Sequence, residues 1–191
     1  FSNELFPVLD VTGGVEESRL ESSSLELHLD ELVSEVDEMM HTIHRTYGET
    51  SEVKDLDMTY LHLMGRHYIR TGEYEKGVRN ILSLVEIASE VRNLDYLLMG
   101  YKQMIYYDIQ IGNTEEMRNY LELALNVADE CNYHKEMGIL LRLKGLNMIM
   151  QGNFSEAERL LKESISTFMV TQSVQRRYAL NIAGAYNYLG E

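Results

Sequence analysis

His41 and His44 are the pair of side chains in this sequence whose spacing could serve metal binding. They stand three residues apart with Asp37 one helical turn earlier, so a helix would present all three on one face. Imidazole and carboxylate groups spaced in this way can hold a transition metal. No cysteine or further histidine has a matching motif nearby, so the pattern favours an ordinary surface helix. We therefore expect no metal, and the sequence indicates no other cofactor.

The remaining reactive side chains do not form a catalytic motif. His62 and His67 are better explained as groove or packing residues than as catalysts, and Cys131 has no basic partner in sequence that would activate its thiol. Gly13-Gly14 lacks the strand-turn-helix context and the Gly-Lys-Ser/Thr ending of a phosphate-binding loop. Serine-hydrolase and zinc-protease motifs are also absent from the sequence. We expect a protein that is not an enzyme.

The composition is that of an acidic chain long enough to bury a sizeable core. Of its 191 residues 45% are apolar, the formal net charge is −14 and the isoelectric point is about 4.8. This charge opposes broad binding to nucleic acids or to anionic membranes, so we expect neither partner. A single cysteine permits no internal disulfide, which favours a reducing, cytoplasmic location. No stretch resembles a signal peptide or approaches the roughly 20 apolar residues of a membrane span.

One short motif recurs at a constant interval and organises the rest of the chain. It begins at Gly72, Gly112 and Gly152, and a further copy opens at Gly190-Glu191. A fixed period of this size, about 40 residues, is typical of stacked helix pairs that present a binding surface. Because the chain opens on Phe1 and ends as a repeat begins, we expect it to be a fragment of a longer protein.

Each repeat is predicted to be a helix pair that turns on the repeated glycine, which tolerates the left-handed conformation that ends a helix. An aromatic residue two positions later (Tyr74, Phe154) is expected to cover the turn, and a small or apolar residue (Gly77, Met117, Ala157) lets the helices approach. The predicted repeats are 57–94, 95–133, 134–172 and a partial repeat at 173–191. The predicted helices are Met58–Thr71, Tyr74–Arg92, Asp95–Ile111, Thr114–Cys131, Lys135–Gln151, Phe154–Val170 and Ser173–Leu189.

The residues before the repeats are predicted to form an extended arm or linker (1–22) and one packing helix (23–48), followed by a polar linker. Ser23-Ser24-Leu25-Glu26 has the spacing of a capping box, and Gly48 supplies a stop. The helix would carry a narrow apolar stripe that fits either packing onto the first repeat or a dimeric coiled coil. The stripe is Leu25, Leu29, Leu32, Val36, Met39 or Met40, Ile43 and Tyr47. The acidic N-terminal arm is also a candidate occupant of any basic groove.

The stretch Gly152-Asn153-Phe154-Ser155-Glu156-Ala157 resembles the turn and second-helix start of a tetratricopeptide repeat. Gly65, Tyr68 and Gly145 stand where that family keeps a small residue and an aromatic. The resemblance covers residues 57–191. It implies an all-α fold, an α-α superhelix or solenoid of antiparallel helix pairs, to which this chain adds an N-terminal helix.

The repeats also depart from the family pattern. The period of about 40 is longer than the usual value of about 34, and the family's late proline is absent. In the second repeat Thr114 replaces the aromatic, while Ile105 and Met117 occupy small-residue positions. Longer repeats of this kind resemble those of bacterial transcriptional regulators and of the peptide-pheromone receptors of Gram-positive bacteria. This resemblance implies a sensory or interaction part of a larger bacterial regulator.

In this family the first helix of each pair lines a concave groove, so the resemblance implies where a ligand would bind. Basic residues gather on the predicted first helices: Arg66, Arg70, Lys102, Arg142, Lys144, Arg176 and Arg177. Guanidinium groups pair with carboxylates, and amides can hold a peptide backbone. The implied groove residues are His62, Arg66, Ile69, Arg70, Lys102, Gln103, Tyr106, Gln110, Arg142, Leu146, Met150, Arg177, Asn181, Asn187 and Tyr188.

Such a groove would suit a protein or peptide segment with acidic side chains or a free C-terminus. Alternatively, the first-helix cations neutralise acids on neighbouring second helices as ordinary surface pairs. The main alternative function is self-association, as a homodimer through the N-terminal region or through the C-terminal end. At that end Tyr186, Tyr188 and Leu189 are expected to be exposed.

Overall fold

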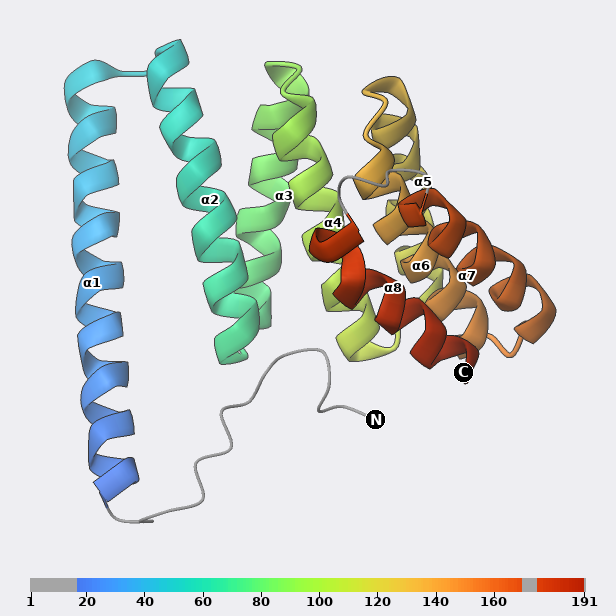
Figure 1. Ribbon diagram of the computed structural model, residues 1–191. Coiled ribbons are helices and arrows are strands. Elements are labelled where there is room, and N and C mark those ends of the chain that lie inside the picture. Colours follow the sequence, from blue (N-terminus) through green and yellow to red (C-terminus); the bar gives the residue numbers. More distant parts are fainter. Residues whose placement is uncertain (1–16, 170–174, 191) are drawn as a thin grey trace. The chain divides into compact units, whose positions relative to one another are not determined.

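Every described element of the protein is a helix (Figure 1). The computed structural model describes residues 17–169 and 175–190. The helices are α1 (Glu17–Tyr47), α2 (Ser51–Thr71), α3 (Tyr74–Glu90), α4 (Leu94–Ile111), α5 (Thr114–Glu130), α6 (His134–Met150), α7 (Phe154–Met169) and α8 (Gln175–Leu189). The described residues contain no strand, which confirms the predicted all-α class. The chain divides into two units, Phe1–Val53 and Lys54–Glu191.

The first unit contains α1, which is longer than predicted. It begins at Glu17, ahead of the predicted capping box at Ser23, so residues 17–22 of the predicted arm or linker (1–22) are helical instead. Residues 1–16 of that arm lie outside the described residues. The helix stops at Gly48 as predicted, with φ of +66°. The next helix starts at Ser51, inside the predicted linker, because the Thr50 hydroxyl accepts a hydrogen bond from the Val53 amide at 3.3 Å.

The second unit contains the three glycine turns that the sequence predicts. Gly72, Gly112 and Gly152 follow α2, α4 and α6 with φ of +86°, +75° and +76°. At the second turn the Asn113 amide donates back to the Asp108 carbonyl at 2.9 Å. At the third turn Asn153 and Met148 form the equivalent bond at 2.8 Å, so both turns satisfy carbonyls at the helix end.

A second set of left-handed turns separates one helix pair from the next, and here no glycine is present. Arg92 and Asn132, which are separated by the same interval as the repeated glycines, have φ of +54° and +53°. The residues that follow them, Asn93 and Tyr133, donate to the Ala88 and Ala128 carbonyls at 2.8 Å each. The repeat therefore extends to the turns between pairs.

The residues that let paired helices approach are buried as expected. A Cβ on Gly77 would lie 2.7 Å from Cγ1 of Ile69 and 3.0 Å from its backbone nitrogen, so α2 and α3 pack too closely for a side chain there. In the second pair Ile105 and Met117, both 0% exposed, fill the equivalent space. Ala157 is 2% exposed in the third pair. In the second pair, larger side chains therefore fill the space between the helices, whereas in the other pairs small residues let the helices pack closely.

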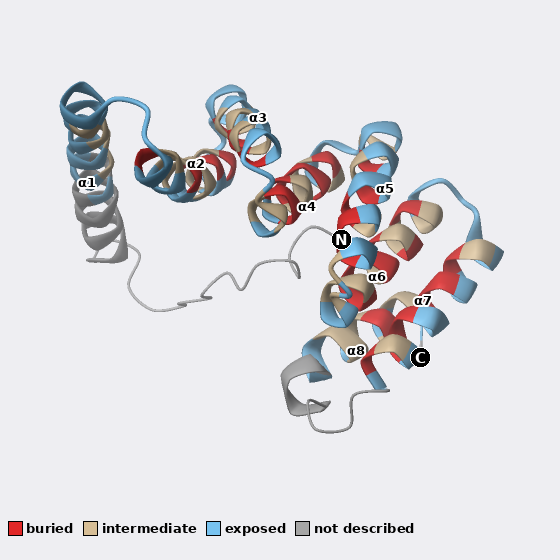
Figure 2. Cartoon of the chain, turned by 90° about the horizontal axis from the view of Figure 1, so that it is seen from above, coloured by how far each residue is buried: buried red, intermediate tan, exposed pale blue. Residues whose placement is uncertain are grey.

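Successive helices of the second unit pack on one another and alternate between two layers. Helices α2, α4, α6 and α8 lie along one side, and α3, α5 and α7 along the other (Figure 2). The largest core cluster joins α4, α5, α6 and α7 around residues such as Leu121, Leu140 and Phe168. Buried Asn147 ties α6 to the start of α5, since its Nδ2 donates to the Thr114 carbonyl at 3.2 Å.

Two expectations about large apolar side chains were wrong. Phe154 is 68% exposed, which leaves little of its ring to cover the α6–α7 turn. Tyr186, Tyr188 and Leu189 are only partly exposed, because α8 packs them around a cluster that includes Leu161. None of the described helices combines the length and the apolar character needed to cross a membrane.

Candidate functional site

The candidate site is the surface of the even-numbered helices of the second unit, called here the even-helix face and formed by α2, α4, α6 and α8. Direct side-chain contacts join these helices in succession: Gln103 with His62, Lys102 with Glu136, and Arg142 with Tyr188. The helices predicted to line a groove therefore do lie side by side (Figure 2).

His62 and Gln103 join α2 to α4. The Gln103 amide nitrogen lies 2.6 Å from His62 Nδ1 and 3.2 Å from the His62 carbonyl oxygen. Burial lowers the pKa of His62, and the charges of Arg66 and Lys102 lower it further, which favours a neutral ring whose Nδ1 accepts from the amide. Gln103 is buried and its amide nitrogen is bonded to His62, so the side chain offers no exposed donor to a ligand. Its Oε1 has no partner among the described residues.

Lys102 and Glu136 join α4 to α6. The Lys102 Nζ lies 2.5 Å from Glu136 Oε2, and the two side chains are 23% and 18% exposed. Glu136 lies in the first turn of α6, and the sequence interpretation did not include it among the charges of this face. Tyr106 is half-buried next to this pair; burial raises the pKa of its hydroxyl, with Arg142 and Glu136 acting in opposite directions.

A hollow of about 360 Å³ opens beside this ion pair, between α4 and the start of α6. It is lined by Asp95, Leu98, Met99, Lys102, Tyr133, His134, Lys135 and Glu136. The Tyr133 hydroxyl donates to Asp95 Oδ1 at 2.7 Å, and this bond raises the pKa of Tyr133 to about 12. The sequence analysis did not predict this hollow. The available signal was Tyr133, which stands one repeat after Asn93, the residue whose side chain caps α4.

Arg142 joins α6 to α8. Its Cζ lies 5.9 Å from the centroid of the Tyr188 ring, within range of a cation–π contact. Its Nε is buried and has no hydrogen-bond partner in the described part of the chain. The Arg142 side chain therefore packs against Tyr188 of α8 and is only partly exposed.

The other predicted groove residues are distributed between surface and interior. Arg66, Arg70, Gln110, Met150 and Asn187 are exposed, Leu146, Asn181 and Tyr188 are partly buried, and Ile69 is buried. Arg177 belongs to α8, and its side chain lies outside the described residues.

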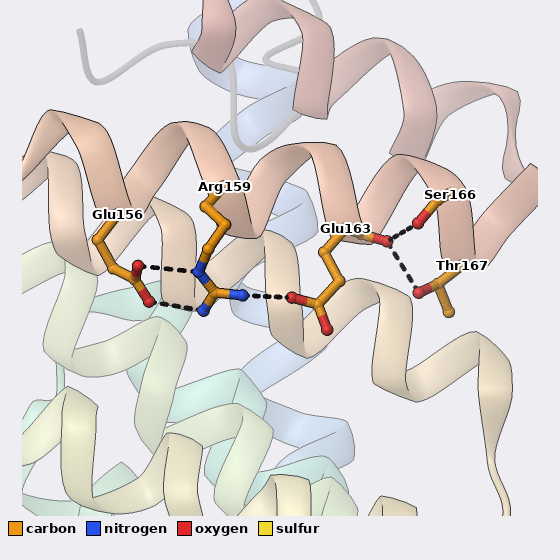
Figure 3. Close-up of polar contacts among 5 residues, drawn as sticks. All are labelled: Glu156, Arg159, Glu163, Ser166 and Thr167. Carbon is orange, nitrogen blue, oxygen red and sulfur yellow. Dashed lines mark hydrogen bonds and ion pairs between the residues drawn. The ribbon is translucent and has the colours of Figure 1, made fainter.

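Cations on the two layers have different partners. On α3 and α7 the cations pair with acids of their own helix: Lys76 with Glu73, Arg79 with Glu75, Arg159 with Glu156 and Glu163, and Lys162 with Glu158. The Arg159 network is seen in Figure 3. On the even-numbered helices Lys102 pairs with Glu136 of the same face, and Lys54, at the start of α2, pairs with Glu90 of α3 at 2.7 Å. Arg66, Arg70, Arg142 and Lys144 form no ion pair with any described carboxylate, although Lys144 helps Arg159 to lower the pKa of Glu156 on α7.

Asp108, on α4, is a buried carboxylate. It is 2% exposed, and its Oδ2 has no partner among the described residues. Burial, followed by the charge of Glu116, raises the pKa of its carboxyl from 3.8 to about 6. Tyr68 and Met148 occupy the equivalent positions of the neighbouring repeats, so the carboxylate stands at a site of otherwise apolar character.

Among the described residues no three His, Cys, Asp or Glu side chains converge as metal ligands would, at His41 and His44 or elsewhere. No protein-family model, no curated protein and no solved structure matches the chain. The tetratricopeptide assignment therefore remains a prediction that rests on the repeated residues themselves.

Proposed function

We propose that this chain is a non-catalytic, tetratricopeptide-like repeat domain that binds a protein or peptide segment on its even-helix face. The segment would carry acidic side chains or a free C-terminus. In this proposal the helix pairs follow a superhelical path and the even-helix face lines its groove. The resemblance of the repeats supports a role as the sensory or interaction part of a larger bacterial cytoplasmic regulator.

The observation that carries the proposal is the difference in charge pairing between the two layers. If the even-helix cations served to neutralise acids of the odd-numbered helices, ion pairs would link the layers. One such pair is present, between Lys54 Nζ at the start of α2 and Glu90 Oε1 of α3 at 2.7 Å. The other ion-paired acids of α3 and α7 have partners on their own helices, as with Glu75 and Arg79. Arg66 and Arg70 are exposed and form no such pair in the described chain. Exposed guanidinium groups of this kind can form paired hydrogen bonds to a ligand carboxylate.

Apolar side chains on α4 and α6 would supply the rest of a binding site. Met99 is 41% exposed and Leu98 lines the same hollow, while Met150 is 37% exposed on α6. Methionine side chains adapt to differently shaped partners, which suits a peptide ligand. The combination favours a segment in which acidic and apolar side chains alternate.

A peptide-array screen followed by fluorescence anisotropy tests the proposal. Acidic peptides with free C-termini would be compared with scrambled and neutral controls at low and high salt. The Arg66→Glu, Arg142→Glu variant should lose about tenfold or more in affinity, since it reverses two charges on the face. The matched Arg79→Glu, Arg118→Glu variant changes net charge equally but on α3 and α5, and should bind within about twofold of the native chain. Equal losses in both variants, or no peptide binding at all, would contradict the proposal.

Self-association is the second candidate, and the exposed apolar stripe of α1 favours it. Leu29, Leu32 and Val36 are 43%, 45% and 40% exposed, and Met39 is 61% exposed. Their alternating steps of three and four suit a coiled coil with α1 of a second copy. Sedimentation of the native chain and of a Leu32→Glu, Met39→Glu variant tests this candidate. A concentration-dependent dimer that the variant abolishes supports it, and a monomer at all concentrations excludes it.

A further inference from the structure

The hollow that Glu136 lines has an equivalent place one repeat earlier, and there the space is filled. Each residue that lines the hollow lies one repeat period after a residue of α2 or of the start of α4. The residue equivalent to Glu136 is Tyr96, in the first turn of α4. Its hydroxyl lies 2.8 Å from Thr59 Oγ1 and its ring centroid 6.4 Å from that of His62. The ring also packs against the apolar cluster around Met58, so it closes the junction between α2 and α4.

Glu136 does not fill the corresponding space between α4 and α6. It pairs instead with Lys102, at 2.5 Å. Met99, the equivalent of Thr59, is 41% exposed, and it lines the hollow of about 360 Å³ together with Leu98. The hollow is therefore the space in which the preceding junction holds a tyrosine ring.

The chemistry of the lining favours an apolar occupant. Glu136 lies within ion-pair distance of two lysines, and the Asp95 carboxylate accepts a hydrogen bond from Tyr133. A charged occupant would compete with these contacts, whereas an apolar group would leave them in place. The side chains of Leu98 and Met99 supply the apolar part of the lining. A methionine sulfur makes favourable contacts with aromatic rings, so Met99 suits a ring in particular.

We propose that the hollow between α4 and α6 binds an aromatic side chain of the ligand segment. That a peptide supplies this ring rests on the proposed function above, whereas the fit of a ring to the hollow does not. Aromatic side chains seated in pockets often contribute a large share of the affinity of an interface. The hollow would thus give the even-helix face a preference for an aromatic residue near the acidic residues of its ligand.

Methyl NMR of the full chain with methyl-labelled methionine tests the proposal without any peptide. The probe is N-acetyl-phenylalanine amide, and the corresponding leucine and alanine amides are the controls. We expect the phenylalanine probe to shift the Met99 signal saturably, because a ring changes the resonance of a methyl group packed against it. It should bind about fivefold more tightly than the leucine probe, as for the extra affinity of an aromatic contact. No shift of Met99, or equal affinities for the phenylalanine and leucine probes, overturns the proposal.

Two variants of Glu136 test whether the space itself is the site. Glu136→Tyr places in the hollow the residue that fills the preceding junction, and should weaken binding of the phenylalanine probe about tenfold or more. Glu136→Gln removes the charge but keeps the space, and should bind the probe within about twofold of the native chain. An unchanged affinity in Glu136→Tyr, or equal losses in both variants, contradicts the proposal. The remaining methionine signals show whether each variant is folded, and the probe comparison on the native chain decides the question without them.

The probe carries no carboxylate, so this experiment and the anisotropy experiment can fail separately. Acidic peptides that bind while the phenylalanine probe leaves Met99 unchanged would remove the aromatic site and leave the proposed function standing. A probe that binds at Met99 while no peptide binds to the chain would do the reverse.

Discussion

Replacing Asp108 by asparagine should make the protein more stable at neutral pH and less sensitive to pH. The carboxyl group is 2% exposed, and its Oδ2 has no hydrogen-bond partner among the described residues. The ionisable groups near it are Glu116, which adds repulsion, and Tyr120, whose own pKa is raised by burial and by Asp108. The ionised form of Asp108 is therefore poorly accommodated between α4 and α5.

The expected size of the effect follows from the pKa of this carboxyl. Burial and Glu116 raise it from 3.8 to about 6. Since the folded chain holds this proton more tightly than the unfolded chain, the contribution of Asp108 to stability falls as pH rises from about 4 through about 6. A shift of about two pH units corresponds to about 3 kcal/mol above that range. The asparagine amide also needs partners, so the expected gain at neutral pH is about 1–2 kcal/mol.

Urea unfolding followed by far-UV circular dichroism, repeated from about pH 7.5 to about pH 4.5, measures this effect. The difference between native chain and Asp108→Asn variant should be largest at the neutral end and shrink towards the acidic end. Glu122→Gln removes an exposed carboxylate from the same region and should change stability by no more than about 0.5 kcal/mol. A difference that does not vary with pH, or an asparagine variant that is less stable at neutral pH, would refute the reasoning.

Three further predictions concern packing, turns and the central ion pair, and urea unfolding measures each. Gly77→Leu should destabilise the protein by about 3 kcal/mol, because even a Cβ would lie 2.7 Å from Ile69 Cγ1; a loss below about 0.5 kcal/mol would contradict this packing. Gly112→Ala should cost about 1–2 kcal/mol through its φ of +75° alone, since no atom lies within 4 Å of the added Cβ, and an unchanged stability would argue against the left-handed turn. A double-mutant cycle on Lys102→Ala and Glu136→Ala should give a coupling of about 1 kcal/mol, whereas strictly additive losses would show that the pair contributes nothing.

The glycine turns were the most predictable part of the fold, because only a few residue types tolerate their backbone conformation. Gly72, Gly112 and Gly152 all have positive φ as the period indicated. The turns at Arg92 and Asn132 follow the same period. Residue type gave no signal at Arg92 and a weak one at Asn132, because asparagine adopts the left-handed conformation more readily than other non-glycine residues. Their conformation is stabilised by backbone hydrogen bonds that residue spacing does not reveal.

The period predicted which side chains share the even-helix face but not their interactions. The helical period places Lys102 and Gln103 on α4 facing neighbouring helices, yet it cannot tell that Gln103 would be buried against His62. Nor could it identify Glu136 as the partner of Lys102, because that contact depends on how one repeat packs on the next. The burial of Asp108 likewise follows from packing between α4 and α5, although its apolar repeat equivalents were visible in the sequence.

His62, Lys102 and Arg142 occupy the same position in successive repeats but differ in how far they are available to a ligand. His62 is neutralised by its surroundings and bonded to Gln103, Lys102 is paired with Glu136, and Arg142 is held against α8. His62 contacts Tyr96, and Lys102 pairs with Glu136. The two partners of each contact are separated by the same number of positions in the sequence. The repeat therefore determines where each of these side chains lies. Contacts with the next repeat determine how accessible the side chain is to a ligand. By this reasoning a ligand would find its most accessible positive charge at Arg66 and Arg70, towards the α2 end of the even-helix face.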